Sequence, residues 1–135
     1  MKGIADTGFI VAFLNRSDRY HGWAGEVARG VSEPLLTCEV VLAEAAFQVG
    51  SLNRVLALVQ DGLLKVDFDL GHNFEEVREF AERYDDRVPD LADLCLVRMS
   101  EVHSHLPVFT VDESDFRVYR RNKREVIPIV CPPRG

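Results

Sequence analysis

The amino-acid sequence predicts an α/β protein whose central β-sheet is mostly parallel. Short apolar segments alternate along the chain with longer segments of helical apolar spacing, as expected when helices connect parallel strands. The length of 135 residues fits one compact domain, and the 47% hydrophobic content is enough to fill its core. We expect one domain over residues 1–130 and a tail over 131–135, where Pro132 and Pro133 stop regular structure.

The first half of the chain is expected to contain two strands, each followed by two helices. A strand over 2–5 precedes a helix that starts at Thr7 and ends at the polar stretch 15–18. A second helix over about 20–30 is predicted by apolar residues at i, i+4 and i+8, namely Trp23, Val27 and Val31. The remaining elements of this half are a strand at 34–37 and helices at 38–49 and 52–60.

The second half is expected to continue the alternation of strands and helices. Residues 63–68 alternate like a strand, and residues 73–84 carry a helical apolar face. Pro89 then stands at the start of a helix over 91–103, where proline is tolerated. Two further apolar strands are predicted at 107–111 and 126–130.

The composition excludes several classes of protein. The net charge of −6 argues against nucleic-acid binding through overall basicity and favours a basic partner. Cys38, Cys95 and Cys131 are odd in number and far apart, so they indicate neither a zinc site nor a disulfide framework. The start of the chain reaches Asp6 before any apolar stretch long enough for a signal peptide, and no apolar run is long enough to cross a membrane. We expect a cytoplasmic protein with three reduced thiols.

Four carboxylates occupy positions that predict a shared site. Asp6 follows the first predicted strand and Asp112 follows the fourth. Groups at the carboxyl ends of parallel strands converge on one edge of the sheet, so these two residues are expected to lie together. Glu44 lies inside the third predicted helix, and Asp93 lies in the first turn of the sixth.

Glu44 is the most informative of the four residues. Its helical neighbours Val40, Val41 and Phe47 are apolar, so the spacing predicts that it projects from an apolar face. An ionised carboxylate in such a place is costly unless a cation or hydrogen bonds compensate it. The alternative is that the helix is rotated so that Glu44 lies at a wet edge.

The other acidic residues also have plain structural alternatives. Asp6 can cap the helix that begins at Thr7, and Asp112 can begin a turn over 112–115. Asp90, three residues before Asp93, can cap the sixth helix or orient a ligand. The four carboxylates together favour a site for Mg²⁺ or Mn²⁺, which are hard ions that take oxygen ligands. Such ions activate water and stabilise the leaving oxygen in phosphodiester hydrolysis.

Four segments, in the same order along the chain, resemble motifs of the PIN-domain family. The segment IADTGFIVAFLN resembles the opening motif of the family, in which an aspartate precedes a threonine. The segment LLTCEVVLAEAAF, which contains Glu44, resembles the second motif. The segment VPDLADLCLVRMSE, which contains Asp90 and Asp93, resembles the third. The segment VFTVDESDFRVYR, which contains Asp112, resembles the fourth. The likeness extends over about residues 2–130 and is closest to the VapC-like toxins of bacterial and archaeal toxin–antitoxin pairs.

This resemblance implies a three-layer α/β/α PIN-like fold and an Mg²⁺- or Mn²⁺-dependent endoribonuclease. It also implies an RNA substrate, a cognate antitoxin protein and a homodimer. The catalytic metal ligands would be Asp6, Glu44, Asp93 and Asp112, with Asp115 as a possible fifth carboxylate. Residues that orient the ligands or contact phosphate would be Thr7, Asp90 and Thr110. Two departures from the family pattern are Gly8 in place of the more usual serine and Leu94 in place of alanine.

Basic, aromatic and histidine residues are further candidates for contact with a substrate, a partner or a metal. Arg117, Arg120 and Arg121 begin a basic cluster after the fourth motif and are candidates for RNA phosphate contact; the alternative is a solvated turn. The aromatic segment 20–23 is expected to pack or to form a dimer face. The histidines of segment 103–105 follow a helix end without partners at metal-ligand spacing, a position that suits the helix dipole.

Two other functions compete with a metal-dependent ribonuclease. A catalytically weak PIN-like module used for partner binding predicts a broken acidic set, whereas all four positions are filled here. A phosphoacceptor receiver domain needs paired acids after the first strand and a lysine directly after a late strand. Asp6 stands alone, and no predicted late strand is followed directly by lysine, so this function is disfavoured.

Overall fold

The central sheet is built from five short apolar segments. The computed structural model describes residues 1–133. The strands are β1 (Ile4–Ala5), β2 (Leu35–Thr37), β3 (Leu64–Val66), β4 (Val108–Phe109) and β7 (Ile129–Val130). Their order is β3-β2-β1-β4-β7, and every neighbouring pair is parallel. The predicted α/β class with a parallel sheet is confirmed.

The α-helices between residues 7 and 102 follow the predicted segments closely, and some of them begin at residues whose side chains satisfy free backbone groups. They are α1 (Thr7–Leu14), α2 (His21–Gly30), α3 (Glu39–Val49), α4 (Leu52–Gln60), α5 (Phe74–Arg83), α6 (Leu91–Val102) and α7 (Glu113–Val118). Side chains of Asp6, Ser51, Asp90 and Asp112 accept hydrogen bonds from the first turns of α1, α4, α6 and α7. Within residues 1–133, no helix has the length and apolar character needed to cross a membrane.

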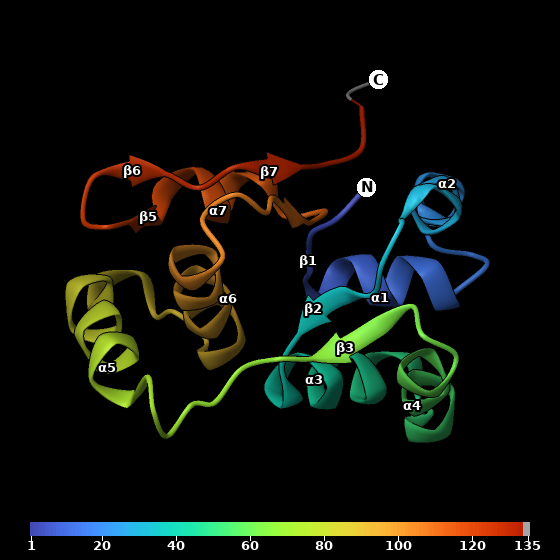
Figure 1. Cartoon of the computed structure of the whole chain (residues 1–135), viewed down its shortest axis with the longest axis horizontal. Helices are drawn as coiled ribbons and strands as arrows, with labels where there is room; N and C mark the ends of the chain where they lie inside the picture. Colours follow the sequence, from blue (N-terminus) through green and yellow to red (C-terminus); the bar gives the residue numbers. More distant parts are fainter. Residues whose placement is uncertain (134–135) are drawn as a thin grey trace.

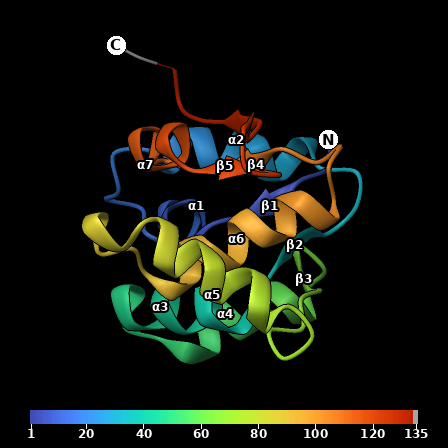
Figure 2. The ribbon, with the colours of Figure 1, turned by 90° about the vertical axis from the view of Figure 1, so that its left-hand side faces the viewer.

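The helices cover the two faces of the sheet and make a three-layer arrangement. Helices α1 to α4 connect β1, β2 and β3, which follow one another in the same direction across the sheet. Figure 1 shows α1 and α2 on one side of the strands, α5 and α6 on the other, and α3 and α4 below β3. In the turned view of Figure 2, α5 and α6 lie in front of the sheet. The core therefore occupies both faces of the sheet, with buried residues from β1, α1, α3, α6 and β4.

The strand order creates a crevice between β1 and β4. The chain leaves β1 toward β2 on one side and leaves β4 toward β7 on the other, while β1 and β4 are direct neighbours. In open parallel sheets, ligands bind at the carboxyl ends of the strands where the direction of winding changes. Asp6 follows β1, and Thr110 to Asp112 follow β4, so the topology places the predicted acidic residues at this point.

One helix, α7, was not predicted. The alternative predicted for Asp112 was a turn over 112–115, whereas this residue caps α7. The helix is only six residues long, so it has too few turns to show a helical apolar pattern.

The strand predicted over 126–130 is divided in the structure. Val126 belongs to β6 (Glu125–Val126), which pairs antiparallel with β5 (Arg120–Arg121), and only β7 joins the main sheet. Pro128 separates the two parts because it has no backbone N–H to donate, although its carbonyl accepts from Val108 at 2.9 Å. Residues 131–133 carry no regular structure, and the rest of the predicted tail, 134–135, lies outside the described residues.

Candidate active site

The four predicted carboxylates line one cleft of about 220 Å³. Asp6 reaches it from the end of β1, Asp112 from the end of β4, Glu44 from α3 and Asp93 from the first turn of α6. The other residues that line this acidic cleft are Thr7, Gly8, Gln48, Asp90 and Val111. The fold thus brings together four residues that are spread over more than a hundred positions of the chain.

Three aspartates at this cleft also cap helices. Asp6 Oδ1 accepts from the Phe9 backbone N–H at 2.8 Å, and Asp90 Oδ1 accepts from that of Asp93 at 2.7 Å. Asp112 Oδ1 accepts from the Asp115 N–H at 3.3 Å. Each aspartate can therefore cap a helix and still line the cleft, because a carboxylate has two oxygens and several acceptor sites.

Two threonine hydroxyls form hydrogen bonds with acidic residues of the cleft. Thr7 Oγ1 donates to Glu44 Oε1 at 3.1 Å, which joins the start of α1 to the middle of α3. Thr110, which is fully buried, hydrogen-bonds to the Asp6 carboxylate, and its Oγ1 accepts from the Asp112 N–H at 2.8 Å. Both hydroxyls thereby orient acidic side chains of the cleft.

The environment of Glu44 differs from the predicted apolar face. Its side chain is half-buried, and its helical neighbour Phe47 is 89% exposed. Phe47 therefore does not bury Glu44, because α3 is rotated so that only the side carrying Val41, Leu42 and Ala45 faces the core. Glu44 lies at the edge of the acidic cleft, as the wet-edge alternative stated.

Burial and mutual repulsion raise the pKa values of two of these carboxyl groups toward neutral pH. Burial raises the pKa of Asp6 to about 7, against opposing hydrogen bonds from Thr110 and the Phe9 backbone. The pKa of Asp93 is raised to about 8, first by burial and then by the charges of Asp90, Asp115, Asp6 and Asp112. A hydrogen bond with Asp112 raises the pKa of the Asp115 carboxyl. A cation bound in the cleft would favour the ionised form of these carboxyl groups.

Tyr119, which the sequence did not single out, contacts one carboxylate of the acidic cleft. Its Oη donates to Asp93 Oδ2 at 3.5 Å, and its buried ring packs edge-on against Tyr84 and Phe116 at centroid distances of 5.0 and 5.9 Å. Burial and the Asp93 charge raise the pKa of the Tyr119 hydroxyl, so it stays a donor at neutral pH. It stands directly after α7, and no local motif marks it because this helix is too short to be predicted.

The predicted basic cluster is not a uniform RNA-facing surface. Arg117 is exposed and pairs with Glu113 at 2.9 Å, whereas Arg120 Nη1 donates to backbone carbonyls at the end of α7. The prediction that Arg121 contacts RNA phosphate is corrected. Its side chain is buried and donates to Ser100 O at 2.9 Å and to Glu125 Oε1 at 2.7 Å. Its guanidinium joins α6 to the β5–β6 hairpin and is not available to a substrate.

Arg87 is a cation near the acidic cleft that the sequence did not single out. It lies in the short 3₁₀ helix Asp85–Arg87 before α6, and its charge lowers the pKa of Asp115 against the other influences on that carboxyl. Its neighbour Val88 is 87% exposed and adopts a left-handed conformation with φ 47°, which is strained for a β-branched residue. Strained backbone of this kind is concentrated at functional sites.

The aromatic and histidine residues that are not expected to bind metal or RNA make contacts within the fold. Trp23 packs edge-on against Phe9 at 5.9 Å, and His21 Nδ1 lies 2.8 Å from the Ala12 carbonyl oxygen. His103 follows α6 as its C-cap and lies 3.8 Å from an Asp67 carboxylate oxygen. The packing prediction for the segment 20–23 is confirmed at Trp23.

The donor set of the acidic cleft fits a hard divalent cation in chemistry. The candidate ligands are all carboxylates, and burial together with the neighbouring carboxylates raises the pKa values of Asp6 and Asp93. Among residues 1–133, no three acidic, histidine or cysteine side chains already stand in the geometry of a metal site. Glu44, Asp93 and Asp112 are only partly buried.

Comparison with known proteins supports the fold. No family model matches the chain, and no curated protein matches it in sequence. Among solved structures, the chain is similar to VapC20 of Mycobacterium tuberculosis, described as a Sarcin–Ricin loop cleaving toxin, with a TM-score of 0.68 and 18% identity. The match covers 80% of this chain and 87% of that chain. The predicted three-layer PIN-like fold is therefore confirmed.

Proposed function

We propose that this protein is a divalent-metal-dependent endoribonuclease that hydrolyses RNA phosphodiester bonds and serves as the toxin of a toxin–antitoxin pair. One observation carries the proposal: Asp6, Glu44, Asp93 and Asp112 line a single cleft at the carboxyl ends of β1 and β4. The shared fold with a toxin that cleaves the Sarcin–Ricin loop supports this assignment. Fold alone does not determine function, so the acidic cleft is the main argument.

The proposed cofactor is Mg²⁺ or Mn²⁺, held by Asp6, Asp93, Asp112 and Glu44. When bound, the ion supplies charge that neutralises the phosphate and lowers the pKa of a bound water molecule. Asp115, which contacts Asp112 through its backbone N–H, is proposed to support that ligand or to add a fifth carboxylate. No side chain has to act as a nucleophile in this chemistry.

The surrounding residues would hold the carboxylates in position. Thr110 fixes Asp6 and the backbone of Asp112, and Thr7 fixes Glu44. Asp90 accepts from the Asp93 N–H and adds negative charge beside that carboxyl. Such neighbours commonly change metal affinity or activity by roughly 10–100-fold when they are removed.

The RNA backbone needs cationic contacts that the net charge of −6 does not supply overall. We propose Arg87 and Arg117 as the contacts beside the cleft, with Arg120 supporting the end of α7. Arg87 acts electrostatically on Asp115, and Arg117 is an exposed residue of α7, which starts from Asp112. Local cations at the rim position the phosphate without making the whole surface basic.

The proposal is tested by incubating a mixed RNA pool, including a Sarcin–Ricin loop hairpin, with the protein in EDTA, Mg²⁺ or Mn²⁺. Wild type is expected to cut only with metal, and Asp93→Asn and Asp6→Asn are expected to lose at least about 100-fold in rate. Asp61→Asn is the matched control, because Asp61 is exposed after α4 and does not line the cleft. Circular dichroism verifies that each variant is folded.

A different outcome would remove the proposal. If folded wild type cuts no RNA in either metal and calorimetry detects no Mg²⁺ or Mn²⁺ binding, the fold serves partner binding instead. Equal loss of cutting in Asp61→Asn and Asp93→Asn would show that the acidic cleft is not the site.

The proposed partners are a cognate antitoxin protein and a second copy of the chain. The acidic net charge favours a basic antitoxin segment, and the exposed apolar side chains Phe47, Leu52 and Leu56 of α3 and α4 are suited to protein contact. Light scattering of the purified protein tests the homodimer. Growth arrest on expression of wild type, but not of Asp93→Asn, tests toxicity.

A further inference from the structure

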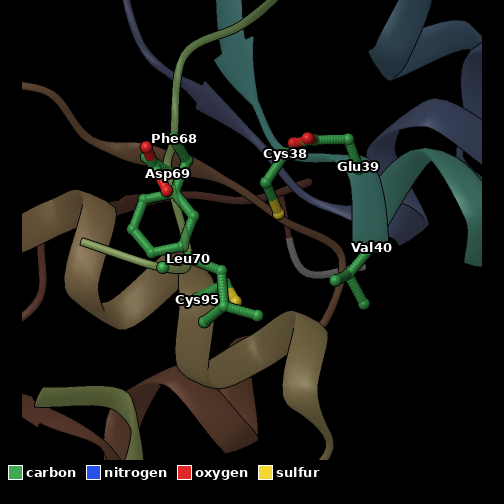
Figure 3. Close-up of a pocket in the computed structure, with 8 residues that line it drawn as sticks. Cys38, Glu39, Val40, Phe68, Asp69, Leu70 and Cys95 are labelled. Atoms are coloured by element: carbon green, nitrogen blue, oxygen red, sulfur yellow. The ribbon is translucent and has the colours of Figure 1, made fainter. Parts of the chain in front are cut away.

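Two buried cysteines line a second cleft, which has a volume of about 490 Å³ and shares no lining residue with the acidic cleft. Cys38 is the N-cap residue of α3, and Cys95 lies in the second turn of α6. Figure 3 shows both sulfur atoms in the space between Val40 and the segment 68–70. The two thiols come from distant parts of the sequence and meet only in the folded chain.

The two thiols act strongly on each other. The hydrogen bond from Cys95 is the largest influence on the pKa of Cys38 and lowers it, ahead of the opposing effect of burial. Backbone N–H groups of Val40 and Val41, at the start of the eleven-residue helix α3, lower the pKa further. A helix N-terminus and a donor thiol both favour thiolate, which is the nucleophilic form of cysteine.

We propose that Cys38 and Cys95 form a redox-active dithiol, which a peroxide-class oxidant converts reversibly into an intramolecular disulfide. The geometry that supports this is that both thiols border the same cleft and are almost fully buried there, at 1% and 0% exposed. The other residues that line this cleft are Val40, Phe68, Leu70 and Gly71, together with the carboxylates Glu39 and Asp69.

The chemistry balances without any further reactant. The Cys38 thiolate attacks one oxygen of hydrogen peroxide, so that an S–O bond forms, the O–O bond breaks and the departing hydroxide takes a proton to become water. The Cys95 sulfur then attacks the Cys38 sulfur, so that the S–S bond forms and the S–O bond breaks. The hydroxyl group leaves with the Cys95 proton as a second water molecule. Thiol–disulfide exchange with a reducing dithiol reverses the reaction.

Such a disulfide would tie the start of α3 to the start of α6. These helices carry Glu44 and Asp93, so oxidation would restrict the movement of two carboxylates that the proposed metal site needs. This consequence rests on the proposed function, whereas the thiol chemistry does not. The test below therefore measures the thiols directly.

The reduced, folded protein is treated with hydrogen peroxide, then unfolded with N-ethylmaleimide present, digested and mapped by mass spectrometry. We expect a peptide pair joined through Cys38 and Cys95, lighter by two hydrogens than the free pair, while Cys131 carries the maleimide. Cys131 is the internal control, because it lines another cleft and contacts Glu113 at 3.7 Å. Cys131→Ser should give the same cross-link, and dithiothreitol should abolish it.

The opposite pattern overturns the proposal. Full alkylation of Cys38 and Cys95 in peroxide-treated protein, with Cys131 oxidised, would show that the buried pair is inert. Equal yields of the three possible cysteine pairings would show that the fold does not direct the reaction. Cys38→Ser and Cys95→Ser should each lose the cross-link, and if either fails to fold, the wild-type and Cys131→Ser maps decide alone.

Discussion

Gly8 and Val111 pack directly against each other in the acidic cleft, because a Cβ atom at position 8 would lie 2.4 Å from Cγ2 of Val111. Gly8 is the second residue of α1, and Val111 follows β4, so the two meet where the carboxyl ends of β1 and β4 adjoin. Sequence reasoning noted glycine where a serine is more usual in the resembling family. The structure supplies the reason, because the Val111 side chain takes the space that a serine would need.

The first prediction is that Gly8→Ala lowers stability. Overpacking of a filled site typically costs about 1–3 kcal/mol, which exceeds the gain of roughly 1 kcal/mol when alanine replaces a helical glycine. Urea unfolding followed by circular dichroism measures the change in free energy of unfolding.

Val111→Ala supplies the control for this relationship. With the valine methyl groups removed, Gly8→Ala is expected to be neutral or stabilising, so the two substitutions should be strongly non-additive. Additive effects within about 0.3 kcal/mol would contradict a direct contact between the two positions.

The second prediction concerns pH and stability in the absence of metal. The pKa values of Asp6 and Asp93 are raised to about 7 and about 8 from 3.8. The folded state therefore binds more protons than the unfolded state between pH 4 and 8, and the contribution of these groups to stability is lost as pH rises through this window. Asp93→Asn removes its part of that loss. At pH 8 the variant is expected to melt at least ~3 °C above wild type. For a domain of this size, this shift corresponds to about 1 kcal/mol in the free energy of unfolding.

Thermal melts at pH 5 and pH 8, each with and without Mg²⁺, measure this effect. The advantage of Asp93→Asn should be small at pH 5, and Mg²⁺ should stabilise wild type at pH 8 more than it stabilises the variant. An advantage of the same size at both pH values would show that the Asp93 carboxyl is not the titrating group.

The third prediction assigns a positioning role to Tyr119. Tyr119→Phe removes the donor to Asp93 Oδ2 but keeps the ring packed on Tyr84 and Phe116, so the fold should be retained. We expect the rate of RNA cleavage to fall about tenfold and the Mg²⁺ concentration needed for half-activity to rise. Metal titrations of cleavage rate provide both quantities.

Tyr84→Phe is the matched control for Tyr119→Phe. The Tyr84 hydroxyl accepts from the Arg120 N–H at 2.9 Å and does not line the cleft. Equal losses of activity in the two variants would mean that the aromatic cluster acts on stability alone.

The fourth prediction separates two arginines of one predicted cluster. Arg121→Ala leaves buried Ser100 oxygens without their donor and is expected to destabilise the fold by about 2–3 kcal/mol. Arg117→Ala removes an exposed pair with Glu113 and should change stability by less than about 1 kcal/mol. Urea unfolding of both variants, with RNA binding measured on the folded proteins, distinguishes these roles. An Arg121→Ala variant as stable as wild type but unable to bind RNA would restore Arg121 as a substrate residue.

Local patterns in the sequence were sufficient for the order of most elements. The helix over Leu52–Gln60 was predicted to the residue, because Ser51 caps its start and Asp61-Gly62 end it. The last strand and α7 were not predicted correctly, because Pro128 and a six-residue helix leave little periodic signal.

For the acidic cleft, the sequence by itself determined which carboxylates stand at strand ends and helix starts, since these positions follow from apolar periodicity and capping residues. Only the tertiary structure decided what surrounds them. It exposed Phe47 beside Glu44, buried Arg121 and brought Tyr119 to Asp93. These contacts depend on how helices rotate and pack across a sheet. That rotation is set by the sum of many long-range contacts, which spacing along one chain does not encode locally.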